Sequence, residues 1–151
     1  MAKSKFQKTI ESIEDISSAY KCGLRALKTS ERGKVIAADS SLVEGSVDID
    51  LAVKEKYPAE NRWDYAFGYS GKVCYIEVHP AYTSEVTKFL QKLNWLQNWL
   101  KMHAPALNSI PKLSPGYVWV CTQKVAILPK STEARKIAQA GVKLVSVHKL
   151  Q

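Results

Sequence analysis

Three residues near the middle of the chain have the types and spacing needed to hold a divalent cation. Asp64 lies in an apolar run over residues 63–69, and a second apolar run over residues 73–79 ends with Glu77 and His79. Side chains alternate between the two faces of a strand, so we expect Glu77 and His79 on one face. Two carboxylates can bind Mg²⁺, and an imidazole can accept a proton, bind the metal or contact a phosphate. The set predicts metal-assisted cleavage of phosphodiester bonds.

The two apolar runs are expected to form a β-hairpin. Residues 70–72 separate them, and a turn that contains glycine between two β-rich runs is typical of a hairpin. Adjacent antiparallel strands would bring Asp64 and Glu77 close enough to share one cation. On the strand face of Asp64, Ala66 and Gly68 are small, and we expect them to leave room for a substrate or a metal ion.

This arrangement resembles the PD-(D/E)XK nuclease superfamily, which has the restriction-endonuclease-like fold. In that family an Asp starts one strand and Glu-x-Lys lies on the next. Asp64 matches the family Asp, Glu77 matches the acidic residue, and His79 stands where the family usually has Lys. Trp63 precedes Asp64 where the family has Pro. The resemblance covers residues 5–128 and implies an α/β fold with a mixed central sheet flanked by helices, Mg²⁺ or Mn²⁺ as cofactor, and DNA or RNA as substrate.

A second acidic cluster precedes the predicted hairpin. Asp48 and Asp50 alternate with apolar residues over 47–53, and this pattern predicts a half-buried strand. Glu44 or Asp48 could add a further carboxylate to the metal site. The alternative is a solvated strand face with turn residues, which would have no catalytic role.

Basic charge is concentrated in the second half of the chain. The net charge is +8 over 151 residues, but residues 1–85 have a balance of −1 and residues 86–151 a balance of +9. A basic half beside an acid-containing half suits a protein that binds phosphates and holds a cation. A surface that serves only solubility is the alternative.

One face of a predicted helix combines cations with aromatic rings. Lys88, Lys92, Trp95 and Trp99 follow one another at spacings of four, three and four residues. In a nucleic-acid surface, lysine binds phosphate and an indole stacks on a base. We expect Trp99 to pack against a neighbouring element, whereas Trp95 could either pack or stack on a base.

Periodicity and capping residues predict the remaining elements. In order they are a helix over 5–29 capped by Ser4, a strand over 47–53, the hairpin over 63–79, a helix from 83 or 84 to 103, strands over 117–121 and 125–128, a helix from 131 to 141, and a strand over 142–147. We therefore expect a mixed central sheet with helices on both sides.

Length and composition favour one domain over residues 1–151, with no membrane partner. No apolar run approaches the roughly 20 residues that span a bilayer. The basic N-terminus is followed by no apolar segment, so no signal peptide is expected. Cys22, Cys74 and Cys121 are widely spaced, which predicts reduced thiols and a cytoplasmic protein. No feature of the sequence specifies an oligomeric state.

The function favoured by the sequence is Mg²⁺-dependent cleavage of DNA or RNA. In this hypothesis Asp64 and Glu77 bind the metal, while His79 acts as a general base or contacts a phosphate. Two alternatives stay open. The first is a non-catalytic nucleic-acid-binding module on the same fold, and the second is a protein-interaction or antitoxin-like partner that uses exposed aromatic side chains.

Overall fold

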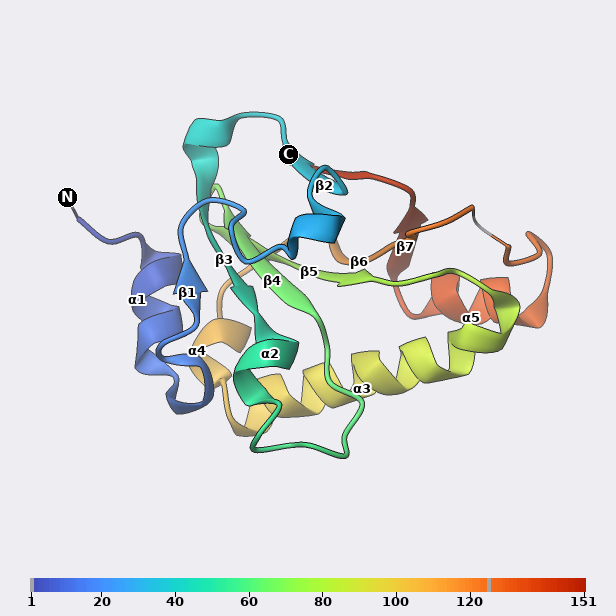
Figure 1. Ribbon diagram of the computed structural model, residues 1–151, viewed down its shortest axis with the longest axis horizontal. Helices are drawn as coiled ribbons and strands as arrows, with labels where there is room; N and C mark the ends of the chain where they lie inside the picture. Colours follow the sequence, from blue (N-terminus) through green and yellow to red (C-terminus); the bar gives the residue numbers. More distant parts are fainter. Residues whose placement is uncertain (1, 125) are drawn as a thin grey trace.

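A mixed six-stranded sheet forms the centre of the computed structural model, which describes residues 2–124 and 126–151 (Figure 1). Across the sheet the strands are β1 (Tyr20–Lys21), β3 (Val43–Asp48), β4 (Tyr65–Tyr69), β5 (Lys72–Val78), β6 (Lys112–Val120) and β7 (Val142–Val145). The first four strands pair antiparallel. β6 then runs parallel to β5, and β7 runs parallel to β6. The predicted mixed α/β architecture is confirmed.

The β4–β5 hairpin forms where the sequence predicted it. Its turn is tight because Ser70 and Gly71 both adopt positive φ angles, 50° and 78°, which suit the right-handed twist of the flanking strands. At the other end of the hairpin, Asp64 comes directly before β4 and His79 directly after β5. The candidate residues therefore lie at strand ends, where the backbone leaves the sheet.

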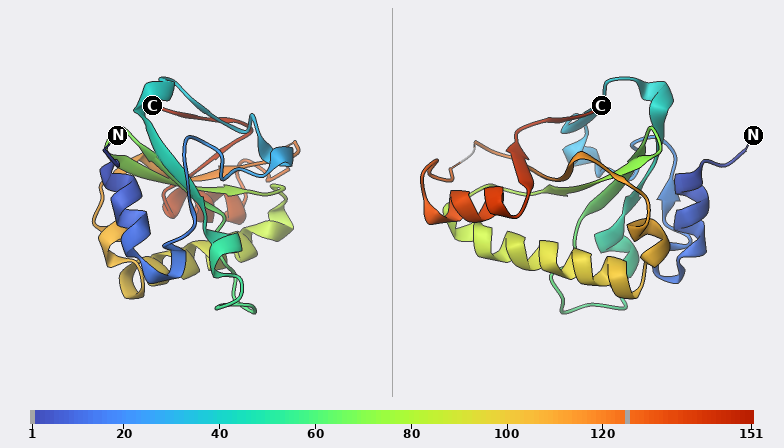
Figure 2. Two further views of the ribbon diagram at one scale, coloured as in Figure 1. Left: turned by 60° about the vertical axis from the view of Figure 1, so that its left-hand side comes forward. Right: turned by 180° about the vertical axis from the view of Figure 1, so that it is seen from behind.

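The α-helices of the described residues all contribute to the hydrophobic core on one face of the sheet, and Figure 2 shows them gathered on that side. They are α1 (Lys5–Ser12), α2 (Ile49–Val53), α3 (Val86–Met102), α4 (Pro105–Asn108) and α5 (Thr132–Gln139). The predicted apolar stripe of α3 is buried: Val86, Phe89, Leu93, Leu96 and Leu100. The long helix α3 lies below the sheet in Figure 1 and spans most of its width.

The opposite face of the sheet has a different cover from the one predicted. There Leu27, Val35 and Leu150 join the side chains of the central strands in a second core. Val35 and Leu150 belong to β2 (Val35–Ala37) and β8 (His148–Leu150), which pair parallel in a separate two-stranded sheet. Short turns and this small sheet take the place of the second helical layer that we expected.

The N-terminal helix is much shorter than the predicted span of 5–29. Ser4 caps it as predicted, because its hydroxyl accepts a hydrogen bond from the Gln7 N–H at 3.0 Å. The helix ends at Ser12, because Ile13 adopts an extended conformation with φ −96° and ψ 117°. Ile13 and Ile16 are nevertheless buried. A turn that folds back onto the core buries both side chains, so their helical spacing does not require a continuous helix.

The predicted strand over 47–53 is wrong beyond Asp48. β3 ends at this residue, and the next five residues form α2. The Asp48 side chain caps α2, since Oδ1 accepts a hydrogen bond from the Leu51 N–H at 2.9 Å. Leu51, which the alternating pattern placed on a core face, is 69% exposed. The capping hydrogen bond stabilises a helix at this point, although the alternation of apolar and polar residues predicted a strand.

The C-terminal strands differ from their predicted bounds. β7 covers the first four residues of the predicted strand over 142–147. The predicted strand over 125–128 lies partly outside the described residues, because it begins at Val125. Within it, Ala126 makes an isolated parallel bridge with Tyr82. Sequence periodicity thus found the edge of the sheet but not its exact extent.

Two predictions from composition can be compared with the structure. The described residues form no helix that is both long and apolar enough to cross a membrane. Cys22, Cys74 and Cys121 are all free thiols, with Cys22 exposed and the other two buried. None of the three forms a disulfide in the part of the chain that the structure describes.

Gly68 allows α1 to approach the sheet closely. A Cβ atom added at this position would lie 2.4 Å from Cγ of Phe6, far inside normal contact distance. Phe6 is buried and fills the space above the glycine. The expectation that Gly68 leaves room for a substrate or metal ion is wrong, because the aromatic ring of α1 occupies that space.

Gly68→Ala should therefore destabilise the protein by about 1–3 kcal/mol, as overpacking in a dense core usually does. Urea unfolding would show a lower midpoint with an unchanged slope. Adding Phe6→Leu, which makes room for the new methyl group, should recover part of the loss. A Gly68→Ala variant as stable as the wild type would contradict the seating of α1 on this strand.

Candidate functional site

The open end of the β4–β5 hairpin brings Asp64 and Glu77 together. The Asp64 N–H donates a hydrogen bond to Oε1 of Glu77 at 3.0 Å, and the Val78 N–H donates one to Oδ2 of Asp64, also at 3.0 Å. Tyr75, two residues before Glu77 on the same strand face, belongs to the core beneath the helices. The two carboxylates are thus fixed side by side, on the face of the sheet that α3 covers.

Lys92 of α3 completes this group. Its ammonium lies 3.0 and 3.2 Å from the two carboxylate oxygens of Glu77, which has no exposed surface. Burial raises the pKa of Glu77 well above its usual value, and the nearby Asp64 charge adds to this effect, whereas Lys92 opposes it. Desolvation disfavours the charge on Lys92, yet the two carboxylates raise its pKa above normal. Lys92 and Glu77 form a buried ion pair that holds α3 against the end of β5.

Asp48 lies at the same end of the sheet as Asp64, but it is paired with Tyr65 of the second core, so its side chain is on the opposite strand face. The Ile49 N–H donates to the backbone oxygen of Asp64 at 2.8 Å, which joins the end of β3 to the start of β4. Burial raises the pKa of Asp48 to about 6, although its hydrogen bond from the Leu51 N–H and the charge of Lys28 work in the other direction. The negative charge of Asp64 raises the pKa further. Three carboxylates therefore share one end of the sheet.

Glu44 lies at the opposite end of the sheet. Its Oε1 accepts a hydrogen bond from the Gly71 N–H at 3.2 Å, in the hairpin turn. On the same strand, Asp48 is paired with Tyr65, four residues further toward the site. Glu44 therefore cannot add a carboxylate to the site, and Asp48, although nearer, is on the opposite strand face from Asp64 and Glu77.

His79 is directed toward the start of α3. Its Nε2 lies 3.1 Å from Oε2 of Glu85, and this contact is the main cause that lowers the pKa of Glu85. The His79 backbone oxygen accepts a hydrogen bond from the Trp119 indole N–H at 3.0 Å. The basic group that contacts Glu77 is therefore Lys92, and His79 stands beside the carboxylate pair rather than on it.

An ion pair fixes the loop that precedes Asp64. Nε of Arg62 lies 2.7 Å from Oδ1 of Asp50, and an Arg62 N–H also donates to the Tyr57 backbone oxygen at 2.7 Å. Asp50 belongs to α2, so the contact ties residues 54–64 to that helix. The approach of the chain to Asp64 is thereby held in place.

Comparisons with known proteins do not assign a family. The chain matches no protein-family model, and searches against curated proteins and solved structures found no significant match. Within residues 2–124 and 126–151, no group of three or more His, Cys, Asp and Glu side chains is placed to hold a metal ion. The geometry of the two carboxylates and Lys92 is therefore the feature that points to a function.

The remaining residues that we predicted to bind nucleic acid have separate surroundings. Lys88 is exposed, whereas the Lys92 side chain is only 16% exposed and contacts Glu77. Trp95 is half-buried, and its indole N–H donates to Glu60 at 2.8 Å. Trp99 is buried, as predicted. This face of α3 is not one continuous open surface, because loop 54–64 lies along it.

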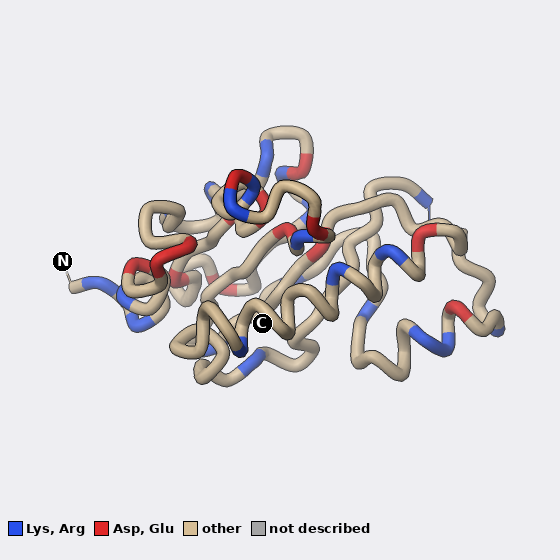
Figure 3. The backbone as a smooth tube through the Cα atoms, turned by 90° about the horizontal axis from the view of Figure 1, so that it is seen from below, with Lys and Arg blue, Asp and Glu red and all other residues tan. Residues whose placement is uncertain are grey.

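Sequence analysis missed a basic groove beside Asp48. The groove has a volume of about 440 Å³, and Lys21, Arg25 and Lys28 line it together with Asp48. These cations lie in the half of the chain with a balanced charge, so the charge distribution gave no signal for them. In Figure 3 basic and acidic positions are mixed in that half, whereas basic positions recur along α3. The groove places positive charge next to Asp48, at the end of the sheet where Asp64 and Glu77 also lie.

Asp48→Asn should make stability less dependent on pH. Because the folded pKa of about 6 exceeds the ordinary value of 3.8, the native protein binds this proton more tightly than the unfolded chain does. The stability contributed by this group is complete below pH 3.8 and is lost as the pH rises through about 6. Asn keeps the helix cap but does not titrate.

The measurement is the free energy of unfolding in urea at pH values below and above this window. Relative to Asp48→Asn, the wild type should lose stability as the pH rises. A difference that stays constant across the window would show that the Asp48 carboxylate is not desolvated in the native state.

Proposed function

We propose that the protein is a metal-dependent nuclease that cleaves phosphodiester bonds of DNA or RNA. One observation carries the proposal: Asp64 and Glu77 are fixed side by side at adjacent strand ends, with the Lys92 ammonium on one of them. Phosphodiester hydrolysis requires neutralisation of charge on the phosphate and activation of a water molecule. Paired carboxylates that hold a cation, together with a lysine, provide groups suited to both tasks.

The order of the elements supports a restriction-endonuclease-like fold. α1 precedes the antiparallel strands β3, β4 and β5, and then come α3 and the parallel strand β6. Asp64 comes directly before one central strand and Glu77 lies near the end of the next, as the resemblance to PD-(D/E)XK nucleases implies. The family has a Lys two residues after the Glu. Here the ammonium group comes from Lys92 on the following helix.

The donor atoms fit Mg²⁺ or Mn²⁺. Mg²⁺ prefers oxygen ligands and is commonly held by one or two carboxylates, with water and substrate phosphate oxygens in the other positions. Asp64 and Glu77 supply two such carboxylates. The bound ion would stabilise charge on the phosphate and lower the pKa of a water molecule.

The protein side chains have distinct roles in this proposal. Lys92 places a fixed positive charge where the phosphate would meet the carboxylates. Asp48 lies on the opposite strand face and has no direct part in this chemistry. His79 lies outside the carboxylate pair and is better placed to contact a phosphate than to act as the base.

A non-catalytic nucleic-acid-binding module is the second candidate. It is favoured by the complete burial of Glu77 and by the contact of both its oxygens with Lys92. If this ion pair persists when nucleic acid binds, Glu77 takes no part in chemistry. The protein would then bind the nucleic-acid backbone through the groove beside Asp48 without cleaving it.

Cleavage should depend on the carboxylates and on Lys92. We expect Asp64→Asn, Glu77→Gln and Lys92→Met each to lower the rate by at least about 100-fold, because each removes charge that the transition state requires. His79→Ala should retain most of the activity. Lys88→Met is the matched control, since it removes an exposed lysine one helical turn from Lys92.

The assay uses labelled single- and double-stranded DNA and RNA with Mg²⁺ or Mn²⁺, and an excess of EDTA provides the metal-free reference. Cleavage that persists in Glu77→Gln or in EDTA would contradict the proposed site. Binding of nucleic acid without metal-dependent cleavage by the wild type would favour the non-catalytic module.

The groove beside Asp48 should carry much of the salt-dependent affinity. Replacing Lys21, Arg25 and Lys28 with Gln should reduce the slope of log K against log salt by about 0.9 for each duplex phosphate that is no longer neutralised. The matched control replaces three exposed lysines of the basic C-terminal half: Lys130, Lys136 and Lys143. Equal effects of the two triple variants would mean that binding follows net charge and that the groove has no special role.

A further inference from the structure

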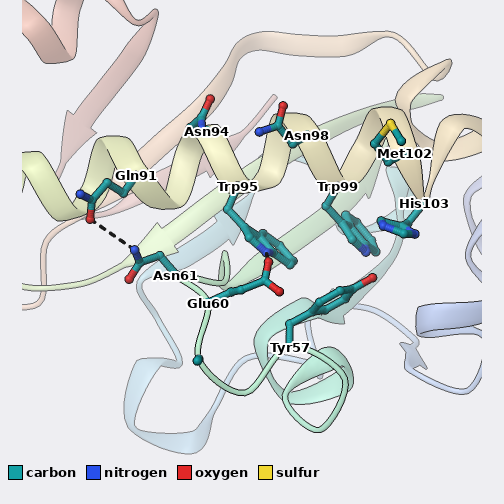
Figure 4. A pocket seen from close by; sticks show the side chains of 11 residues that line it. Tyr57, Glu60, Asn61, Gln91, Asn94, Trp95, Asn98, Trp99, Met102 and His103 are labelled. Carbon is teal, nitrogen blue, oxygen red and sulfur yellow. Dashed lines mark hydrogen bonds between the residues drawn. The ribbon is translucent and has the colours of Figure 1, made fainter.

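A second groove runs along α3 and has no role in the chemistry proposed above. Its volume is about 500 Å³, and loop 54–64 forms the wall opposite the helix (Figure 4). Aromatic rings and side-chain amides dominate its lining, and the residues that line it include neither Lys nor Arg. Such a surface does not suit a phosphate, but it does suit a flat, uncharged ring with polar edges.

The aromatic wall is held rigidly. The indoles of Trp95 and Trp99 are nearly parallel, 8° apart, with centroids separated by 5.8 Å, and Tyr57 meets Trp95 edge-on. The Trp99 indole N–H and the Tyr57 hydroxyl both donate to Oδ2 of Asp15 at 2.9 Å. One largely buried carboxylate thus fixes two of the rings before any ligand arrives, which lowers the cost of ordering them on binding.

The polar lining offers both donors and acceptors. Asn94 and Asn98 are exposed on α3, and the Asn61 amide donates to Oε1 of Gln91 at 3.2 Å. A side-chain amide carries a donor and an acceptor side by side, which is the pattern needed to bind the edge of a nucleobase. Figure 4 shows Asn61 and Gln91 meeting at one end of the groove, whereas Asn94 and Asn98 point away from the Trp95 ring. The groove therefore combines a stacking surface with groups that read a base edge.

On both walls of the groove, the lining residues lie close in sequence to residues of the carboxylate site. On the loop, Asn61 precedes Asp64 by three residues, a distance of at most about 11 Å along an extended chain. On the helix, Gln91 is followed directly by Lys92. A strand whose phosphate lies at Lys92 would bring a neighbouring base to the groove.

We propose that this groove binds one unpaired nucleobase of the nucleic acid, and this assignment rests on the proposed function of the adjacent site. The base stacks against Trp95, and the amides of Asn61 and Gln91 bind its edge. Oligosaccharides also stack on indoles and bind amides. Continuity with a site suited to phosphodiesters favours the base, and the groove thereby selects substrates with an unpaired nucleotide near the bond that is cut.

The test compares two labelled single strands, one intact and one in which the bases are replaced by abasic residues. Kd is measured by fluorescence anisotropy in EDTA, so that cleavage is not required. Trp95→Ala should raise the Kd of the intact strand about tenfold, because the base no longer stacks on an indole, and should leave the Kd of the abasic strand unchanged. Unlabelled nucleoside monophosphates are added as competitors to distinguish a free nucleotide from a strand.

Asn61→Ala provides a second variant, at an exposed loop amide that lines the groove. It should weaken binding of the intact strand selectively, to a smaller extent than Trp95→Ala. Gln97→Ala is the matched control, because Gln97 is an exposed amide of α3 that does not line the groove. It should change neither Kd.

Equal losses of affinity for intact and abasic strands in Trp95→Ala, or no loss for either strand, would overturn the assignment. So would NMR shifts of the Trp95 indole N–H on addition of a chitin oligosaccharide but not of single strands. If the wild type does not cleave nucleic acid but Trp95→Ala loses affinity for the intact strand alone, the nuclease proposal fails and the assignment of the base groove stands. If the wild type cleaves nucleic acid but Trp95→Ala binds both strands as the wild type does, only the assignment of the groove fails.

Discussion

A carboxylate buried at the end of the central strand determines how this end of the molecule is built. Glu77 has no exposed surface, so its charge must be balanced inside the protein. The Asp64 N–H and the Lys92 ammonium provide that balance, and they come from the start of β4 and from α3. Breaking a buried ion pair by removing one partner typically costs about 3–5 kcal/mol, because the remaining charge stays desolvated. The same contacts that position the candidate site therefore also fix three elements of the fold.

The sequence was sufficient to predict the relation of Asp64 to Glu77, because that relation is local. A two-residue turn sets the register of the hairpin, and alternation then places both side chains on one face. Lys92 could not be assigned in the same way. Its contact with Glu77 depends on how α3 is rotated above the sheet, and the apolar stripe identifies only the face that enters the core. The face next to the stripe meets whatever the tertiary fold brings to it, here the end of β5 and loop 54–64.

The N-terminal region shows the opposite case, in which a clear pattern misled. Apolar residues at helical spacing continue well past Ser12, but Ile13 turns the chain and the later members of the pattern reach the core from separate turns. A continuous helix would have dispersed Lys21, Arg25 and Lys28 along its surface, so their common groove could not be foreseen. The periodicity of apolar residues predicts which side chains are buried, but it does not show whether they belong to one helix or to several separate turns.

Loop 54–64 links the surfaces that the proposed function requires. The Arg62–Asp50 ion pair ties the loop to α2, which begins at the Asp48 cap beside the basic groove. From Arg62 the chain leads in one direction to the wall of the aromatic groove and in the other to Asp64. A shift of this loop would move the wall of the base groove and the Asp64 carboxylate together. In the proposed function, base binding and cleavage would be coupled through this short segment, whose position depends on contacts that neither process uses directly.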